Sequence, residues 1–212
     1  MIGDKLIIKK KHTETAGKIY DVISDIYSSP FVVSIAGESG AGKSEIASEL
    51  CRILQKKSIR SAILQQDDYF VFPPKTNRLM RLANQKQIGP YEVKLDFLDS
   101  NLRSFKRREN PLFKPLVNFD LDLILTEEID LKQIDILIVE GTYTTLLKLT
   151  DFKVFLESDY RETRIDRNER NREENDSFIE AVLEKEHEII NKHRELSDIR
   201  IGSDFQRIVL KN

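Results

Sequence analysis

The segment Gly37–Ser44, GESGAGKS, is the feature that most restricts the fold of this 212-residue chain. Its glycines, lysine and serine have the spacing G-x-x-x-x-G-K-[ST]. The segment follows the apolar run FVVSIA and precedes EIASELCRIL, which places Ile46, Leu50 and Leu54 on one helical face. A glycine-rich turn between a buried strand and a helix directs backbone N–H groups and the positive end of the helix dipole at an anion. The pattern therefore predicts a phosphate-binding loop.

This loop supplies the candidates for nucleotide binding, which are Gly37, Glu38, Ser39, Gly40, Ala41, Gly42, Lys43 and Ser44. Its backbone would bind phosphate oxygens, Lys43 would reach the outer phosphates, and the Ser44 hydroxyl would bind Mg²⁺. The alternative is an ordinary glycine-rich turn with an exposed lysine. The strand before the loop and the helix after it favour phosphate binding, because the motif has its mechanism in that context.

Further apolar runs continue the alternation of strands and helices. SAILQQ (61–66), IDILIVEG (134–141) and FKVFLES (152–158) predict buried strands, and residues 177–193 predict a helix. Such alternation predicts an α/β fold of three layers, with a mainly parallel sheet covered by helices on both faces. The segment DIRIGSDFQRIVL predicts one or two edge strands near the end of the sequence.

Two parts of the chain do not follow this alternation. Residues 1–30 are predicted to be an extension, with a short strand within residues 1–12 and a helix over residues 13–29. Residues 70–130 are an excursion that contains prolines and shows no steady period, which is typical of a binding loop or a lid. The main domain would span residues 31–212.

Charge and hydropathy exclude some classes of partner. The chain has 34 basic and 36 acidic residues and a formal net charge of −2, so no general basic field favours nucleic acid. No stretch approaches the length of about 18 apolar residues that a membrane-spanning helix needs, and the first residues do not have the order of a signal peptide. We therefore expect a cytoplasmic protein that binds neither nucleic acid nor membrane. Whether it forms a homo-oligomer stays open.

Acidic residues at two strand ends are candidates for chemistry at the phosphate. Glu140 ends the run ILIVE, at the edge of a parallel sheet where a partner for Mg²⁺ is needed. Asp67 and Asp68 follow the strand SAILQQ and would stand beside the γ-phosphate. A carboxylate there could accept the proton of an attacking hydroxyl group, or contact the metal through water. The alternatives are a solvent-facing glutamate and an ordinary acidic turn.

Four segments together resemble one enzyme family. VSIAGESGAGKS, QQDDYF, ILIVEG and RETRIDRNERNR are similar, in this order, to the uridine kinase and phosphoribulokinase-like branch of P-loop kinases, which includes the nicotinamide riboside kinases as relatives. The resemblance covers roughly residues 31–205. It implies a P-loop NTPase fold, the cofactors ATP and Mg²⁺, and transfer of the γ-phosphate to a hydroxyl group of a small molecule. A nucleoside such as uridine is the leading acceptor.

The resemblance also implies roles for single residues. Asp67 would be the catalytic base, Lys43 would bind the β- and γ-phosphates, and Ser44 and Glu140 would support Mg²⁺. The residues Asp68, Tyr69 and Phe70 would lie at the acceptor pocket.

Arginines would cover the nucleotide from a lid over about residues 161–176. Arg164, Arg167 and Arg170 match the arginines of the family's lid, and a period of three places them near one helical face. We expect Arg164 and Arg167 to act in catalysis and Arg170 to bind the nucleotide. The alternative is a solvated helix with internal salt bridges, because the acidic residues Glu162, Asp166 and Glu169 are interleaved with the arginines.

The acceptor-binding part departs from the family pattern. YEVKLDFLD (91–99) matches the family's acceptor-binding stretch, but Val93 stands where the family has a ribose-contacting aspartate. Glu92 and Asp96 are therefore the candidates for contacting the acceptor. KPLVNFDLD (114–122) lacks a tyrosine and a histidine of the family's next segment, and EENDSF replaces the tip of the lid. A sugar phosphate, a nicotinamide riboside-like compound or a vitamin-like alcohol stays open as the acceptor.

A function of another class is a nucleotide-dependent regulatory switch, either an ATPase or a GTPase. GTPases commonly select guanine with an N-K-x-D segment, and the sequence contains none. The acidic turn and the arginine series also suit a kinase better. A nonenzymatic member of the family is the remaining alternative, and Lys43, Ser44, Asp67 and Glu140 argue against it. The sequence does not distinguish ATP from GTP.

Overall fold

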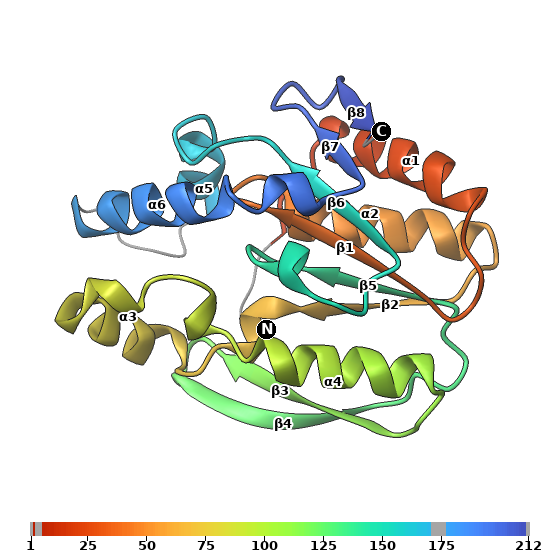
Figure 1. Ribbon diagram of the computed structural model, residues 1–212, viewed down its shortest axis with the longest axis horizontal. Helices are drawn as coiled ribbons and strands as arrows, with labels where there is room; N and C mark the ends of the chain where they lie inside the picture. Colours follow the sequence, from red (N-terminus) through yellow and green to blue (C-terminus); the bar gives the residue numbers. More distant parts are fainter. Residues whose placement is uncertain (1, 3–5, 171–176, 211–212) are drawn as a thin grey trace.

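A six-stranded sheet forms the centre of the computed structural model, which describes residues 2, 6–170 and 177–210 (Figure 1). Its strand order is β2-β5-β1-β6-β7-β8, and neighbouring strands are parallel except for β7 and β8. The bounds are β1 (Phe31–Gly37), β2 (Ser61–Gln65), β5 (Ile136–Glu140), β6 (Phe152–Leu156), β7 (Ile199–Ile201) and β8 (Ile208–Leu210). The strands predicted from apolar runs are confirmed, and the C-terminal segment forms β7 and β8.

Helices cover both faces of this sheet. α1 (Lys10–Ser24) and α2 (Lys43–Lys56) pack on the face to which Val33 and Ile35 of β1 contribute. α4 (Leu95–Lys106) packs on the other face, with Val32 and Ala36. Side chains of β1 alternate between the two faces and all of its residues are buried, so its sequence is a continuous apolar run. The three-layer α/β/α fold is confirmed.

The remaining helices lie around the carboxyl ends of the strands and in the excursion. They are α3 (Pro74–Ala83), α5 (Arg164–Arg170) and α6 (Ser177–Ile190), with the 3₁₀ helices η1 (Gln66–Tyr69), η2 (Gln85–Gln87), η3 (Pro90–Glu92), η4 (Thr144–Leu146) and η5 (Arg194–Leu196). Among the helices of the described residues, none combines the length and the apolar character needed to cross a membrane.

The excursion over residues 70–130 contains more regular structure than its sequence predicts. Besides α3 and α4 it forms an antiparallel hairpin of β3 (Leu112–Asn118) and β4 (Leu123–Ile129), which lies beside α4 in Figure 1. No residue of β4 is buried. A strand without a buried face does not need alternating apolar residues, so its sequence does not show the pattern from which strands are predicted. The hairpin was therefore not predicted.

The N-terminal extension differs from the prediction at both ends of its helix. α1 begins at Lys10 because His12 Nδ1 accepts a hydrogen bond from Lys9 N (3.1 Å), which satisfies an N–H group at the helix start. It ends at Ser24, before the predicted end at residue 29, and Ile26 beyond it is 52% exposed. Within residues 1–12, Ile2 forms an isolated bridge with Asn118 of β3 and α1 begins at Lys10. Residues 1 and 3–5 lie outside the described residues, so the strand expected there stays a prediction.

Candidate active site

The phosphate loop lies at the carboxyl end of β1, in the middle of the sheet. β1 ends at Gly37 and α2 begins at Lys43, as the strand–loop–helix prediction requires. Gly40 and Gly42 have φ angles of +79° and +90°, where a side chain would be strained. A Cβ atom at Gly40 would also lie 2.7 Å from Cγ of Arg167. Glycine at position 40 therefore allows both the backbone turn and the close approach of α5.

The register of the sheet brings the predicted metal-binding residues together. β5 lies beside β1, so Glu140 pairs with Ile35 just before the loop. Glu140 is buried, and its Oε1 accepts hydrogen bonds from Ser44 Oγ (3.1 Å) and from Gln65 Nε2 (3.3 Å). A hydroxyl and a carboxylate are hard oxygen ligands, which suit Mg²⁺ completed by phosphate and water. The side chains present at this position therefore fit the ion that the sequence predicts.

Lys43 is the first residue of α2, and its side chain turns back to the loop. Its Nζ donates a hydrogen bond to the carbonyl oxygen of Glu38 at 2.8 Å. This contact keeps an ammonium group at the glycine-rich turn. The position agrees with the predicted attraction of phosphate by Lys43.

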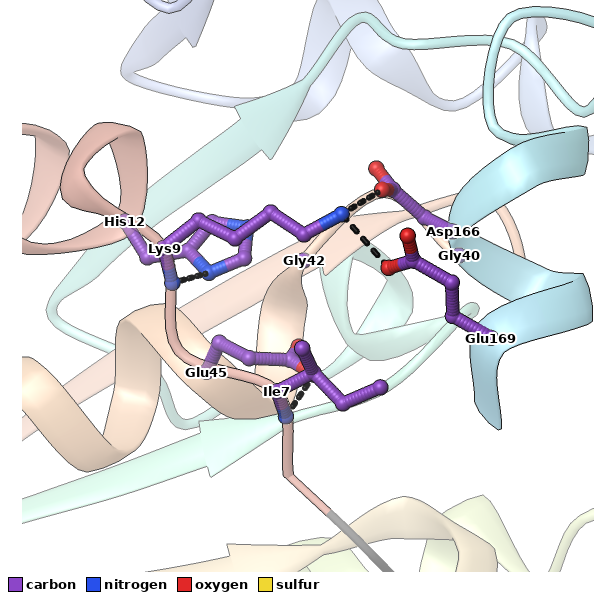
Figure 2. Close-up of a pocket in the computed structure, with 8 residues that line it drawn as sticks. All are labelled: Ile7, Lys9, His12, Gly40, Gly42, Glu45, Asp166 and Glu169. Carbon is purple, nitrogen blue, oxygen red and sulfur yellow. Dashed lines mark hydrogen bonds and ion pairs between the residues drawn. The ribbon is translucent and has the colours of Figure 1, made fainter. Parts of the chain in front are cut away.

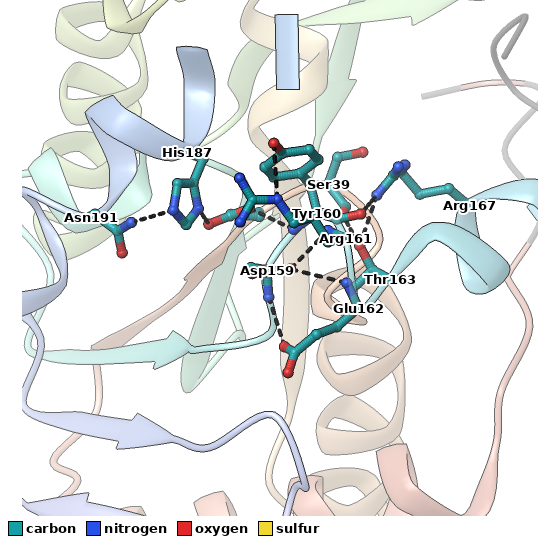
Figure 3. A network of polar contacts seen from close by, with 10 residues as sticks. Ser39, Asp159, Tyr160, Arg161, Glu162, Thr163, Arg167, His187 and Asn191 are labelled. Carbon is teal, nitrogen blue, oxygen red and sulfur yellow. Dashed lines mark hydrogen bonds and ion pairs between the residues drawn. The ribbon is translucent and has the colours of Figure 1, made fainter. Parts of the chain in front are cut away.

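The segment that leads into α5 packs directly on the phosphate loop (Figure 3). Thr163 Oγ1 donates to the carbonyl oxygen of Ser39 at 2.9 Å, and Arg167 Nη1 donates to Thr163 Oγ1 at 2.9 Å and to the carbonyl oxygen of Tyr160. Arg167 thus lies against the loop, whereas Arg164 is exposed. The side chain of Arg170 and residues 171–176, which include most of the expected lid tip, lie outside the described residues.

Glu38 anchors the loop to α6 with its side chain. Its Oε2 accepts a hydrogen bond from Tyr160 N (2.7 Å), and its Oε1 contacts His187 Nδ1 (2.6 Å), whose Nε2 contacts Asn191 Nδ2 (2.8 Å). Burial raises the pKa of Glu38, against the opposing effect of its hydrogen bonds with His187 and Tyr160. The carboxylate is therefore engaged within the protein, and nucleotide binding by Glu38 would use its backbone.

The two aspartates after β2 have different surroundings. Asp68 is 1% exposed; its Oδ2 accepts a hydrogen bond from Lys114 Nζ (2.7 Å) and its Oδ1 accepts one from Val117 N (2.9 Å). These contacts fix the β3–β4 hairpin to the end of β2. Asp67 belongs to the same 3₁₀ helix and is half-buried. Asp67 stays the candidate base, while we assign Asp68 to holding the hairpin rather than to binding an acceptor.

The Tyr69 side chain, which was predicted to lie at the acceptor pocket, is buried in the core. Tyr69 is 0% exposed within the core on the α4 side of the sheet, and its hydroxyl accepts a hydrogen bond from Asn101 Nδ2 at 2.8 Å. Burial raises the pKa of this hydroxyl. Phe70 is half-buried, and its backbone forms an isolated bridge with Val93. The tight turn of η1 directs Tyr69 into the core.

Glu92 lies in a buried ion-pair network. Arg81 donates to both of its oxygens (2.6 and 2.9 Å), and Asn77 Nδ2 and Gly89 N donate to it as well. Arg81 Nη2 also donates to Glu186 Oε1 of α6 at 2.9 Å. Arg81 of α3 therefore binds both Glu92 of η3 and Glu186 of α6, and the Glu92 carboxylate is engaged within the protein. The role of Glu92 as a substitute for the missing aspartate stays a prediction.

Asp96 is exposed on α4. Its side chain is 99% exposed and forms a long ion pair, 3.8 Å, with Lys148. Asp96 is not among the residues that line the cavity described next, and its contact with an acceptor stays a prediction.

A cavity of about 450 Å³ lies beside the Ser44–Glu140 pair. Its walls come from α2, β2, the β3–β4 hairpin and the N-terminal extension. Its polar side includes Asp68, Lys114, Glu127 and Glu140, and its apolar side includes Ile2, Leu6, Ile63 and Leu116. The cavity thus includes the candidate metal position, and its lining combines charged and apolar side chains.

Lys114 is a site residue that sequence reasoning missed. It is 6% exposed, and its Nζ contacts Asp68 Oδ2 (2.7 Å), Glu127 Oε2 (2.9 Å) and the carbonyl oxygen of Pro115 (3.1 Å). The segment KPLVNFDLD was recognised as acceptor-related, but a lysine in a sequence signals exposure. Only the fold shows that Lys114 is buried between two carboxylates.

The sequence of this chain matches a family of known proteins. The model of the phosphoribulokinase/uridine kinase family matches residues 32–194. A uridine kinase of Ureaplasma parvum serovar 3 is 28% identical over 160 residues, which cover 73% of this chain and 75% of that protein. A bifunctional alpha-galactosidase/sucrose kinase of Mediterraneibacter gnavus is 30% identical over 82% of this chain and 20% of its own length.

A solved structure agrees in fold. The structure of a possible uridine kinase from Bacillus stearothermophilus has a TM-score of 0.60 with 20% sequence identity, and the match covers 83% of this chain and 94% of that one. The family match spans the phosphate loop, the Ser44–Glu140 pair and α5. This chain therefore belongs to the phosphoribulokinase/uridine kinase family, as an ATP-dependent phosphotransferase that acts on a hydroxyl group of a small molecule.

Proposed function

We propose that this chain is an ATP- and Mg²⁺-dependent kinase whose acceptor is an uncharged compound, with uridine or another nucleoside as the leading candidate. The observation that carries the proposal is that the 450 Å³ cavity is lined by Ser44, the last residue of the phosphate loop, and by Glu140, its hydrogen-bond partner. An acceptor in this cavity would lie next to a nucleotide whose phosphates occupy the loop. Holding two reactants side by side is the main contribution that this reaction needs from a protein.

Few residues are needed for the chemistry. Asp67 would accept the proton of the attacking hydroxyl group, and Lys43, Arg164 and Arg167 would balance the charge of the transferred phosphate. Mg²⁺, when bound, would neutralise phosphate charge beside Ser44 and Glu140. The packing of Arg167 on Gly40 supports its part in this proposal.

The charges of the cavity favour an uncharged acceptor over a sugar phosphate. Three carboxylates, those of Asp68, Glu127 and Glu140, and one ammonium group, that of Lys114, line it and leave a formal charge of −2. Mg²⁺ at Glu140 would offset this charge, but the ion would bind together with ATP, whose phosphate charge exceeds that of the ion, so the loaded site would stay negative. A phosphorylated acceptor would bring like charge to this surface, which costs binding energy. The side chain of Glu127 is 38% exposed, so it is accessible to hydroxyl groups of an acceptor.

A free sugar is the second candidate acceptor. Val93 replaces the ribose-contacting aspartate of the family pattern and is 6% exposed, so it offers no polar contact. One relative, 30% identical to this chain, is named for a sucrose kinase activity. Carboxylates such as Glu127 would serve a sugar as well as the ribose of a nucleoside. The proposal includes a cytoplasmic location and no nucleic-acid partner, and it leaves the oligomeric state open.

The experiment is a panel of acceptors incubated with ATP and Mg²⁺ and analysed by mass spectrometry. We expect a gain of one phosphoryl group on a nucleoside or a free sugar, and none on a sugar phosphate. Nicotinamide riboside and vitamin-like alcohols complete the panel. The variant Asp67→Asn is the control, because it should bind ATP without transferring phosphate. Rapid ATP hydrolysis that no acceptor changes, and that depends on a protein partner, would replace the proposal with a regulatory switch.

A further inference from the structure

The N-terminal extension contributes residues to the candidate site that the family pattern does not assign. Ile2 N donates to the carbonyl oxygen of Val117 (2.9 Å), and the carbonyl oxygen of Ile2 accepts a hydrogen bond from Phe119 N (3.3 Å). Ile2 thereby adds to the edge of β3, and the side chains of Ile2 and Leu6 line the cavity. We call Ile2, Leu6, Ile7 and Lys9 the N-terminal strap.

The apolar wall of the cavity depends on this strap. Ile2 is 45% exposed and Leu6 is 39% exposed, which is high for large apolar side chains beside a cavity. Leu116 of β3 and Ile63 of β2 complete the same wall. An acceptor with an apolar face, such as a nucleobase, would cover these side chains and gain the free energy of burying them. The strap thus supplies two of the apolar side chains that line the cavity, those of Ile2 and Leu6.

The middle of the N-terminal strap follows the start of α2 (Figure 2). Ile7 N donates to Glu45 Oε1 at 3.3 Å, and Glu45 is 1% exposed. His12 then lies against the phosphate loop, because a Cβ atom at Gly42 would be 3.1 Å from its Nε2. These contacts hold the strap beside the loop.

The far end of the strap is bound to α5 by charge (Figure 2). Lys9 Nζ contacts Asp166 Oδ1 at 2.6 Å and Glu169 Oε2 at 2.7 Å, and Lys11 Nζ contacts Asp166 Oδ2 at 2.9 Å. Both acidic residues are neighbours of Arg167 in α5. The sequence suggested that they pair with arginines of their own helix, whereas the structure shows them paired with the N-terminal lysines.

We propose that the N-terminal strap is part of the acceptor site of this kinase and connects it to α5. Ile2 and Leu6 determine which acceptors fit, and Lys9 is a positioning residue that holds α5, and with it Arg167, against the phosphate loop. This inference rests on the proposed function, because it takes the 450 Å³ cavity as the acceptor site. It assigns to this segment a role in specificity.

The first test compares Leu6→Ala with Ile8→Ala in the full-length chain. Ile8 is 47% exposed and does not line the cavity, so it is a matched control. With the acceptor that wild-type protein phosphorylates, Leu6→Ala should raise the acceptor KM about tenfold, as expected for lost apolar contact, and leave the ATP KM unchanged. Equal acceptor KM values in Leu6→Ala, Ile8→Ala and wild type would overturn the specificity role.

The second test compares Lys9→Ala with Lys10→Ala. The Lys10 side chain is 89% exposed and pairs only within its helix, with Glu14 at 3.3 Å, among the contacts of the described residues. Lys9→Ala should raise the ATP KM and lower kcat about fivefold, because α5, and with it Arg167, loses two of the ion pairs that hold it at the loop. Lys9→Arg should restore both values, and Lys10→Ala should change neither. A Lys9→Ala enzyme with wild-type kcat and ATP KM contradicts the positioning role.

The two proposals can fail separately. If wild-type protein phosphorylates no member of the panel, the proposed function fails and the acceptor role of the strap fails with it. The positioning role is then decided by calorimetry with a nonhydrolysable ATP analogue and Mg²⁺. Weaker binding in Lys9→Ala than in Lys10→Ala supports it, and equal binding overturns it.

Discussion

The adjacent residues Asp67 and Asp68 should give opposite phenotypes when each is replaced by asparagine. Asp67→Asn removes the proposed proton acceptor and should lower kcat by about 10²–10⁴-fold. Its free energy of unfolding should stay within about 0.5 kcal/mol of wild type, because Asp67 is half-buried at a turn. Asp68→Asn should instead act on stability, because it removes the charge that holds Lys114 and the hairpin.

The cost of Asp68→Asn follows from the burial of its ion pair. The side chains of Asp68 and Lys114 are 2% and 7% exposed, and breaking a buried pair by removing one partner costs about 3–5 kcal/mol. Asparagine can still accept a hydrogen bond from Val117 N, and Glu127 still contacts Lys114. We therefore expect the lower end, about 3 kcal/mol, which corresponds to about 6–12 °C in Tm for a chain of this size.

Urea unfolding followed by circular dichroism measures this difference, with the kinase assay run on the same preparations. Lys114→Met and the double variant Asp68→Asn/Lys114→Met complete a double-mutant cycle. The double variant should lose less stability than the two single losses added together, because the second change removes a charge that has already lost its buried partner Asp68. Wild-type stability in Asp68→Asn, together with a kcat loss equal to that of Asp67→Asn, would refute the assignment.

Three further predictions concern the loop, the metal position and α5. Glu140→Gln should raise the Mg²⁺ concentration for half-maximal activity about tenfold or more; an unchanged Mg²⁺ titration would remove Glu140 from the metal position. Gly40→Ala should cost about 1–2 kcal/mol in urea unfolding and raise the ATP KM by displacing Arg167, whereas Gly17→Ala in α1, with open space around its Cβ position, should not destabilise. Burial opposes ionisation of Asp166, but its hydrogen bonds from two lysines hold its pKa below the ordinary value of 3.8. A carboxyl group whose pKa is lower in the folded state stabilises the protein at pH values above its unfolded-state pKa, and this stabilisation is lost as the pH falls through the folded-state pKa. Asp166→Asn should therefore have a smaller free energy of unfolding than wild type at pH 7, and this difference should disappear below pH 3.8. A difference that is the same at pH 7 and pH 3 contradicts this origin.

The buried strands and the phosphate loop could be predicted from the sequence because each has a pattern within a short stretch of residues. β1 and β5 are buried on both faces, which produces continuous apolar runs, and the glycine spacing of the loop is set by its own backbone. The neighbourhood of Ser44 and Glu140 then follows from parallel topology, since adjacent strands end at the same edge of the sheet.

The acceptor side could be predicted less well because the environment of its side chains depends on contacts between residues that are far apart in the sequence. Tyr69 and Phe70 are neighbours in sequence, and only the turn of η1 decides that the tyrosine ring enters the core. Glu92 has the right chemistry for binding hydroxyl groups, yet Arg81, eleven residues earlier, binds its carboxylate. Charged pairs between distant segments, such as Lys9 with Asp166, leave no periodic pattern in a single sequence.

The buried guanidinium of Arg81 has a mechanical consequence. It bonds Glu92, the last residue of η3, and Glu186 of α6, and the side chains of Arg81, Glu92 and Glu186 are 12%, 5% and 12% exposed. Separating α3 from α6 would break the charge-assisted hydrogen bond between Arg81 and Glu186, which contributes about 1.5–3 kcal/mol, while Arg81 keeps its bonds to Glu92. By comparison, Ile2 is attached to β3 through two backbone hydrogen bonds, which contribute about 0.5–1.5 kcal/mol each. The junction between α3 and α6 should therefore open less often than the contact between Ile2 and β3. Amide hydrogen exchange should be slow in α6 and fast at Ile2 and Phe119.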